Sequence, residues 1–295
     1  MNRFFFFCIG ASLAFMACSS GDGDEPGMPP VERPLTVVVN ETPFADENGN
    51  APMRQGTRGT VITTETLTKF SMNYEDNKYE VEKSTSTGWA VEPFTWPVDY
   101  DKKISFYAYN AGTFYNEGNY LTFEENENAS TTTDLLVAKQ EDIAWNDTQG
   151  QVSLTFDHAC AAVNFNVLIT NTLSTNLGGS LTMNEIKLMK VVKEGEYYYS
   201  TNSWILGTED KDYTDYTLTN GDMTVTTTET SLPCGTLFLL PQKLGNEACF
   251  FITYTTNGTK KTTTISMADE TWEAGKQYTI DIRLGTSYIQ YQSYP

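Results

Sequence analysis

Short runs of alternating apolar and polar residues dominate this sequence, and they restrict the chain to a β fold. Every second residue is apolar in residues 278–284, and residues 104–109 alternate in the same way. This spacing places the apolar side chains of a strand on one face. Threonine-rich runs such as TVTTTETS and an aromatic content of 13% suit the half-buried surface of a sheet. No amphipathic helical pattern exceeds two turns, so we predict an all-β protein.

Two local signals fix details of the strands. The apolar positions are even-numbered in residues 152–156 and odd-numbered in residues 161–169. Because a strand repeats every two residues, this change of phase predicts a bulge or break between Asp157 and Cys160. Asn257-Gly258 lies between two further strand patterns, which predicts a tight hairpin.

A chain of 295 residues is long enough for two domains. Hydrophobicity falls in TNTLSTNLGGS, where Gly178-Gly179 permits a bend. We therefore predict two β-sandwiches in series, at residues 34–175 and 176–285. The first begins with the strand LTVVVNE (35–41), and strand signals resume with TVITTETL after a loop at 42–58. Residues 286–295 extend beyond the last strand of the second domain.

The N-terminus has the pattern of a secretory signal peptide. Arg3 precedes an apolar run over residues 4–15, which is too short for a stable membrane anchor. The FMAC sequence resembles the lipobox of bacterial lipoproteins, so we expect residues 1–17 to be removed and Cys18 to be acylated. Ordinary secretion is the alternative. Residues 18–33 are acidic and rich in glycine and proline, which predicts a flexible tether.

The net charge bears on the possible partners, and the cysteine positions bear on disulfide formation. A formal net charge of −19 repels phosphate backbones, so no nucleic acid is expected as a partner. Beyond the signal peptide and Cys18, the cysteines are Cys160, Cys234 and Cys249. Each lies in an apolar run and is expected to be a buried thiol; a Cys234–Cys249 bridge across a hairpin stays open.

Residues capable of catalysis or metal binding are sparse. His158 is the only histidine, and we interpret it as a structural residue at the strand break. The acidic runs DENGN (46–50) and TEDKDYTD (208–215) are interpreted as a turn and a solvated loop. We predict no enzyme activity, no cofactor and no metal. Trp89, Trp96 and Trp145 either pack internally or offer a glycan-binding surface, with Trp89 and Trp96 as the contacts.

The loop at 42–58 contains two of the five arginines, Arg54 and Arg58. Structureless loops of this length are uncommon and usually functional, and exposed loop tips are preferred sites of proteolysis. A cut after Arg58 would separate the strand at 35–41 from the following chain. Loss of that strand would leave an apolar groove and an unpaired sheet edge. An uncut surface loop is the alternative.

Several segments, in this order, resemble the fimbrillins of Bacteroidetes. They are the lipobox, TRGTVITTETLTKFSM, FTWP followed by KKISFYAYN, DLLVAK, VSLTFDHACAAVNFNV, LFLLPQ and TWEAGKQYTIDIRL. The resemblance covers residues 34–285. It implies two transthyretin-like β-sandwich domains and a pilus (fimbria) subunit or surface adhesin that crosses the outer membrane as a lipoprotein.

The resemblance also implies processing and assembly. An Arg-specific surface protease removes the first strand, and a neighbouring subunit supplies a replacement strand, commonly from its C-terminal extension. Here the cut is expected after Arg58, leaving Gly59 as the new N-terminus, with Arg54 as second choice. GTSYIQYQSYP (285–295) is the candidate donor strand. The expected partners are other fimbrial subunits, the protease, and ligands on host or bacterial surfaces.

The leading hypothesis is thus a structural or adhesive fimbrial subunit at the cell surface. It would begin as an outer-membrane lipoprotein and join the fimbrium after processing. The alternative is a monomeric surface lipoprotein that binds glycans through exposed aromatic side chains.

Overall fold

The computed structural model describes residues 35–45, 61–84, 88–91, 94, 96–97, 99–286 and 289–294. Strands predominate in this part of the chain, which confirms the all-β prediction. The helical elements are short: α1 (Trp145–Thr148), α2 (Asn171–Leu177), and the 3-10 turns η1 (Ala129–Thr131) and η2 (Asp210–Asp212). Within the described ranges no helix is long and apolar enough to cross a membrane.

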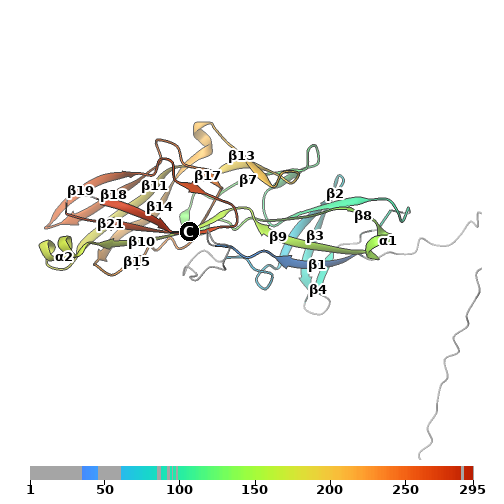
Figure 1. Ribbon diagram of the computed structural model, residues 1–295, viewed down its shortest axis with the longest axis horizontal. Helices are drawn as coiled ribbons and strands as arrows, with labels where there is room; N and C mark the ends of the chain where they lie inside the picture. Colours follow the sequence, from blue (N-terminus) through green and yellow to red (C-terminus); the bar gives the residue numbers. More distant parts are fainter. Residues whose placement is uncertain are drawn as a thin grey trace, which may run out of the picture. The chain divides into compact units, whose positions relative to one another are not determined.

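The first sheet closes on itself as a barrel, in the order β1-β4-β3-β2-β5-β8-β9 (Figure 1). Its interior is filled by apolar side chains from every strand except β4, whose Trp89 and Val91 pack against it while partly exposed. The strands are β1 (Thr36–Glu41), β2 (Lys69–Tyr74), β3 (Asn77–Ser84), β4 (Gly88–Val91), β5 (Ile104–Tyr109), β8 (Leu136–Ile143) and β9 (Gln151–His158).

Two further sheets share a second apolar core, to which both contribute buried side chains. One has the order β15-β10-β21-β22, with β16 also paired to β10; the other has the order β14-β11-β18-β19. The strands of the first are β10 (Ala161–Ile169), β15 (Thr230–Ser231), β16 (Leu237–Leu239), β21 (Gln277–Leu284) and β22 (Ile289–Tyr294). Those of the second are β11 (Leu181–Val192), β14 (Tyr213–Val225), β18 (Cys249–Thr256) and β19 (Thr259–Ser266).

A fourth sheet joins strands from the two halves of the sequence. Its order is β13-β12-β7-β6, and β7 pairs with β12. These strands are β6 (Thr113–Tyr115), β7 (Tyr120–Glu124), β12 (Glu194–Tyr198) and β13 (Ser203–Leu206), and a small sheet pairs β17 (Gln242–Lys243) with β20 (Thr271–Trp272). The buried face of the fourth sheet contributes Leu121 and Tyr197 to a third apolar cluster.

The predicted strand break lies where the sequence places it. β9 ends at His158 and β10 begins at Ala161. The even-numbered apolar residues of β9 fill the barrel, whereas the odd-numbered residues of β10 fill the second core. β10 also pairs with β21 in the same sheet. The sequence-based prediction places residues 161–169 in the N-terminal domain. The division at 34–175 and 176–285 remains a prediction.

Two other local expectations can be compared directly. Asn257 and Gly258 have positive φ values of 48° and 73° and connect β18 to β19, which confirms the hairpin. The expected strand TVITTETL is wrong over its described part, because residues 64–66 form a turn. Threonine side chains there satisfy backbone groups locally: Thr66 Oγ1 accepts from the Thr63 amide at 2.8 Å.

The three cysteines in the described part of the chain are free thiols. Cys160 and Cys234 are buried, and Cys249 is partly buried. No Cys234–Cys249 bridge is formed. Burial raises the pKa of the Cys160 thiol well above its usual range, so this thiol stays protonated and is a poor nucleophile.

Candidate functional site

Strand β1 closes the barrel between β9 and β4. β1 runs parallel to β9 over six paired positions, from Thr36↔Gln151 to Glu41↔Phe156. On its other side it pairs antiparallel with β4, where the described residues give the register Val37↔Trp89. Val37 is buried in the barrel core. Removal of β1 would therefore open the barrel along one edge of β9.

The chain continues in an extended course beyond β1. The Thr42 amide donates to the Phe156 carbonyl at 2.8 Å, and the Ala45 amide donates to the Gly275 carbonyl at 2.9 Å. The Ala45 carbonyl in turn accepts from the Gln277 amide at 3.0 Å, at the start of β21. We call residues 36–45 the leader segment. Its backbone pairs first with β9 and then with the residues that lead into β21.

Phe44 is the most deeply buried side chain of the leader segment, with 1% of its surface exposed. Its ring stacks on the His158 ring, with centroids 3.8 Å apart and planes 22° apart. The Phe238 ring lies 6.1 Å away at an interplanar angle of 27°. We call the space between these two rings the Phe44 socket. It lies in the third apolar cluster, outside the barrel core.

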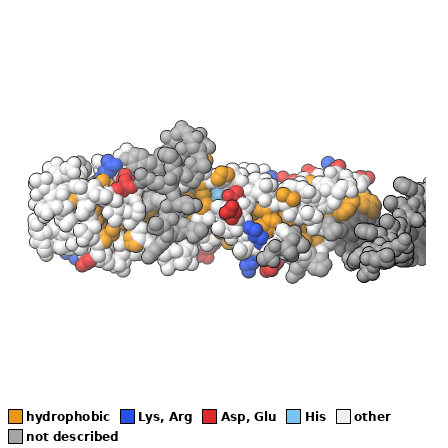
Figure 2. Space-filling view, turned by 90° about the horizontal axis from the view of Figure 1, so that it is seen from below, with side chains coloured by type: hydrophobic (Ala, Val, Ile, Leu, Met, Phe, Trp, Pro, Cys, Tyr) orange, Lys and Arg blue, Asp and Glu red, His pale blue; other side chains and the backbone are white. Residues whose placement is uncertain are grey.

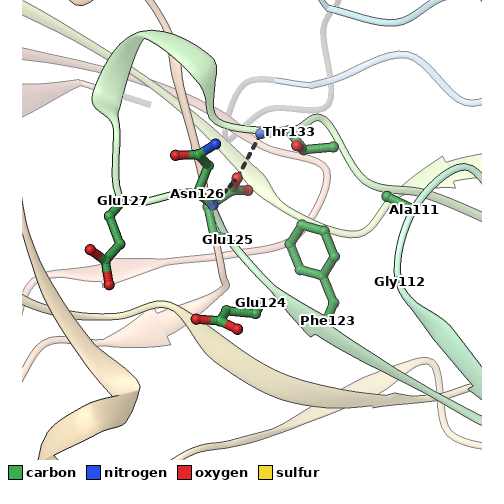
Figure 3. Close-up of a pocket in the computed structure, with 8 residues that line it drawn as sticks. All are labelled: Ala111, Gly112, Phe123, Glu124, Glu125, Asn126, Glu127 and Thr133. Carbon is green, nitrogen blue, oxygen red and sulfur yellow. Dashed lines mark hydrogen bonds between the residues drawn. The ribbon is translucent and has the colours of Figure 1, made fainter.

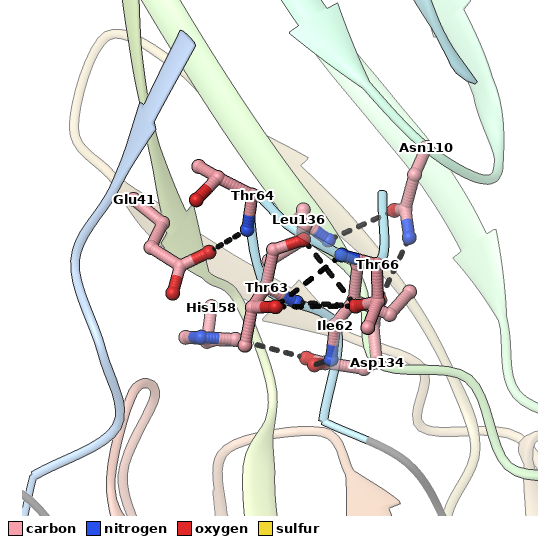
Figure 4. A network of polar contacts seen from close by, with 9 residues as sticks. All are labelled: Glu41, Ile62, Thr63, Thr64, Thr66, Asn110, Asp134, Leu136 and His158. Carbon is pink, nitrogen blue, oxygen red and sulfur yellow. Dashed lines mark hydrogen bonds and ion pairs between the residues drawn. The ribbon is translucent and has the colours of Figure 1, made fainter. Parts of the chain in front are cut away.

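A buried carboxylate, that of Asp134, contacts the His158 side chain that forms one wall of the socket (Figure 4). Asp134 Oδ1 lies 2.8 Å from His158 Nδ1, and both side chains are almost fully enclosed. Asp134 Oδ2 accepts from the Ile62 amide at 2.7 Å. Asn110 holds the backbone on both sides of residue 135. Its side chain donates to the Asp134 carbonyl and accepts from the Leu136 amide, both at 2.8 Å. Asp134 thus connects the socket to Ile62, close to the point where the described chain resumes after the loop at 42–58.

The turn at residues 61–67 contacts the leader segment and the barrel. The Glu41 carboxylate accepts from the Thr64 amide (Figure 4), and Lys83 Nζ donates to the Thr64 carbonyl at 2.7 Å. Ile62 and Leu67 pack on the barrel core. After a chain break between residues 45 and 61, the leader segment would be retained only by non-covalent contacts. The turn would keep its contacts with Asp134 and Lys83.

The sequence-predicted processing and lipidation residues lie outside the described residues. They are Cys18, Arg54, Arg58 and Gly59. The described chain stops at Ala45 before this loop and resumes at Val61 after it. Phe44 and Ile62 therefore flank the region that contains both arginines.

The tryptophans proposed as glycan contacts have different surroundings. Trp96 is 2% exposed and packs edge-on against Phe106 in the barrel core, so its ring faces are covered by protein. Trp89 is partly exposed, with Lys83 Nζ 5.8 Å from its ring centroid. Trp145 is also partly exposed and packs against Trp96.

A row of tyrosines lies on the outer face of the fourth sheet instead. Tyr115 and Tyr120 stack with centroids 5.0 Å apart, and Tyr120 and Tyr198 stack at 5.2 Å. Tyr115 is 44% exposed. On the face seen in Figure 2, hydrophobic side chains form separated groups, with small groups of acidic and basic side chains between them.

The candidate donor segment is docked on its own chain. β22 pairs antiparallel with β21 along its whole length and forms one edge of its sheet. Ile289 and Tyr291 pack against the second core, while Gln290 and Gln292 are exposed. Donation of this segment to another molecule would first require it to leave β21.

A surface pocket of about 420 Å³ lies at the end of β7 (Figure 3). Glu125 lines it, is 2% exposed, and accepts from the Asn126 and Thr133 amides through one oxygen, each at 2.8 Å. Burial raises the pKa of Glu125 to about 8. Lys193 forms ion pairs with Glu124 and Glu127 at the pocket. These contacts fix the turn at residues 125–133, and no group of acidic, His or Cys residues among the described ones is placed to hold a metal.

Sequence reasoning missed the residues that shape the leader site. Phe44 is a lone aromatic in the polar stretch TPFADENGN, and that isolation is the one signal that could have marked it. Asp134 follows three threonines and precedes an apolar run, so nothing local indicates that it is buried. Its partner His158 was expected to be structural, and its contacts agree with that interpretation.

A sequence profile described as fimbrillin-like matches residues 51–293. The chain belongs to the fimbrillin-like family. No curated protein matches it. Among solved structures, the fimbrillin-like chain is similar to a fimbrial protein from Bacteroides vulgatus, with 16% identity, a TM-score of 0.58, and coverage of 88% of this chain and 97% of the other.

A candidate cell adhesion protein from Bacteroides ovatus is similar at 14% identity and a TM-score of 0.56, with coverage of 90% and 97%. One from Bacteroides eggerthii has 15% identity and a TM-score of 0.52, with coverage of 89% and 96%. At these identities the likeness is one of fold. The family itself supports a fimbrial or adhesive protein at the cell surface rather than an enzyme.

Proposed function

We propose that this protein is a structural or adhesive subunit of cell-surface fimbriae that assembles by strand exchange. The observation that carries the proposal is the placement of the leader segment. It completes a barrel through a ladder with β9 and fills a separate socket with Phe44. Release of the leader segment would expose the edge of β9 and vacate an apolar groove, which would favour uptake of another strand.

Processing is proposed to occur in the loop between the leader segment and the turn at 61–67. The cut falls after Arg58, with Gly59 as the new N-terminus, or after Arg54. Either position leaves Ile62 attached to Asp134, so the barrel keeps the turn while it loses the leader segment. The protease is an Arg-specific enzyme at the cell surface.

Export is proposed to proceed through a lipoprotein. Cys18 is acylated after removal of residues 1–17, and the lipid anchors the protein in the outer membrane until processing. Replacement of Cys18 by alanine is expected to abolish labelling with a fatty-acid analogue. Unchanged labelling would contradict the lipid anchor without bearing on strand exchange.

The assembly proposal is tested by mass spectrometry after limited Arg-specific proteolysis of the folded chain. We expect cleavage confined to Arg58 or Arg54. The cut protein should then form SDS-resistant oligomers, seen on gels as a series of bands of increasing mass. The matched controls are Arg58→Gln and Arg54→Gln, singly and together, and only the double variant should remain intact and monomeric. A chain that is cut at these positions and stays monomeric would contradict assembly by strand exchange.

A second candidate function is glycan binding by a monomeric surface lipoprotein. The burial of Trp96 removes one expected contact, whereas the tyrosine row offers exposed aromatic side chains on one sheet face. Glycan-array binding that is lost in Tyr115→Ala and retained in Trp89→Ala would favour this function. Glycan binding that is lost in both variants, or retained in both, would not favour this function.

A further inference from the structure

The leader segment is held at two places that differ in chemistry. Along β9 the contacts are backbone hydrogen bonds in a parallel ladder, and a ladder of this kind accepts almost any side chain on its outer face. Val37 and Val39 add aliphatic contacts with the barrel core. These contacts favour an extended, partly apolar strand but distinguish poorly among such strands.

The Phe44 socket is selective because its walls are aromatic rings. The centroid of the His158 ring lies 3.8 Å from the centroid of the Phe44 ring. The centroid of the Phe238 ring lies 6.1 Å from that of Phe44. Stacked aromatic pairs gain energy beyond that of area burial. A small side chain would leave a cavity in the third apolar cluster, and such cavities are costly. An aliphatic side chain would fill space without stacking.

The socket does not depend on the leader segment for its shape. Asp134 fixes the His158 ring at 2.8 Å and is itself fixed by the Ile62 amide and by Asn110. Phe238 is held by β16, where its amide donates to Thr132 Oγ1 at 3.0 Å. All of these groups lie outside residues 36–45. The walls are therefore expected to remain in place when the leader segment leaves.

We propose that a strand replacing the leader segment must place an aromatic ring between His158 and Phe238, so that the Phe44 socket selects the incoming strand. The requirement is an aliphatic residue at the position of Val39 and an aromatic residue five positions later. This inference rests on the proposed strand exchange and adds the side-chain chemistry of the partner. The occupant is a strand of a second subunit that runs parallel to β9.

A second copy of this chain carries a segment with the required spacing. Ile289 and Tyr294 are five positions apart, as are Val39 and Phe44. Both lie in β22, which is an edge strand among the described residues and pairs there with β21. With Tyr294 in the socket, Ile289 takes the place of Val39 on β9, and Ser287 takes the place of Val37 without supplying its buried aliphatic contact. The second copy is therefore the occupant that the spacing favours.

Peptide exchange into the cut chain tests the inference. The full chain receives the recognition sequence of a sequence-specific protease within residues 46–58 and is cut there. The cut-off N-terminal fragment is removed in denaturant, and the remaining chain is refolded and mixed with fluorescent peptides of residues 34–46. We expect the native peptide to bind and its Phe44→Ala form to bind about 100-fold more weakly. Phe44→Leu should weaken binding less, and Phe44→Trp or Phe44→Tyr should retain most of it. The control Val39→Ala should cost about tenfold.

The outcomes separate the inference from the proposed function. Peptides that bind within threefold of one another whatever residue stands at position 44 would overturn the socket and leave strand exchange intact. A cut chain that binds no leader peptide would overturn both. A peptide of residues 285–295 should bind, and its Tyr294→Ala form should lose binding while Tyr288→Ala does not. Equal binding of the two variants would overturn the assignment of the second copy.

Discussion

The ring of Phe44 lies face to face with the ring of His158, at a centroid distance of 3.8 Å. One residue belongs to the leader segment and the other to the end of β9, more than a hundred positions later in the sequence. This contact places the end of the leader segment against an aromatic wall that the rest of the chain supports. The last residues of the leader segment therefore add a contact to those made by β1.

Phe44→Ala in the intact chain should lower the free energy of unfolding by about 3 kcal/mol, because it removes a fully buried ring and leaves a cavity. Chemical denaturation measures the change. Ile205→Ala is the matched control, since Ile205 is 60% exposed and its loss should cost less than about 0.5 kcal/mol. Equal effects of the two substitutions would show that Phe44 is not held in the socket in solution.

Asp134→Asn should destabilise the protein by about 2 kcal/mol. The substituted amide can accept from Ile62 through its oxygen, but its NH2 group can then donate to His158 Nδ1 only if that nitrogen carries no proton. The proton would then sit on the buried Nε2, which has no partner among the described residues, and a buried polar group without a partner is costly. Asp147→Asn, at an exposed position in α1, should change stability by less than about 0.5 kcal/mol. Thermal unfolding of both variants checks the difference, and a neutral Asp134→Asn would contradict the role assigned to this carboxylate.

Glu125→Gln should change the dependence of stability on pH. The pKa of Glu125 is about 8 in the folded protein because the carboxyl is buried, and it is about 4.3 in an unfolded chain. Between these values the folded state binds more protons, so the contribution of Glu125 to stability falls as pH rises, by at most about 1.4 kcal/mol per pH unit.

Denaturation between pH 5 and pH 8 should therefore show that wild type loses stability relative to Glu125→Gln as pH increases. Glu117→Gln is the matched control, because Glu117 is exposed. Parallel curves for wild type and Glu125→Gln would contradict a raised pKa.

Two glycines near β6 should respond differently to alanine although both have φ of +98°. A Cβ at Gly112 would lie 2.6 Å from the Thr122 carbonyl oxygen, whereas at Gly118 the nearest atom is a Tyr120 ring carbon at 3.7 Å. Gly118→Ala should cost about 1 to 2 kcal/mol for the backbone conformation alone. Gly112→Ala should lower the free energy of unfolding by about 2 kcal/mol more than Gly118→Ala, because of the added clash. Equal losses of unfolding free energy in chemical denaturation would contradict the close approach of Gly112 to β7.

Local patterns in the sequence predicted local features well. The change of phase before Ala161 gave the end of β9, and Asn257-Gly258 gave a hairpin, because side-chain alternation and turn conformation depend on neighbouring residues. The strand at 36–41 was also expected. Its parallel pairing with β9 was not, since the partner lies far away in the sequence and a ladder is made by backbone groups that all residues share.

The candidate site was harder to predict for the same reason. TVITTETL has the composition of a strand, yet hydrogen bonds between threonine side chains and nearby amides favour a turn. Trp96 was a candidate for an exposed aromatic surface because the sequence does not show that its ring packs against Phe106 inside the barrel. Asp134 is a carboxylate whose burial depends on His158 and Ile62 from other parts of the chain.

Hydrogen exchange of β9 measured by mass spectrometry tests the central claim, that the leader segment is a replaceable strand. In the intact chain the amides of residues 151–156 should be protected, as should those of β18 and β19. After the cut at Arg58 and release of the leader segment, β9 should exchange faster while the β18–β19 hairpin stays protected, and assembly should restore the protection of β9. Protection of β9 that is unchanged by release of the leader segment, or that does not return in assembled material, would contradict the account.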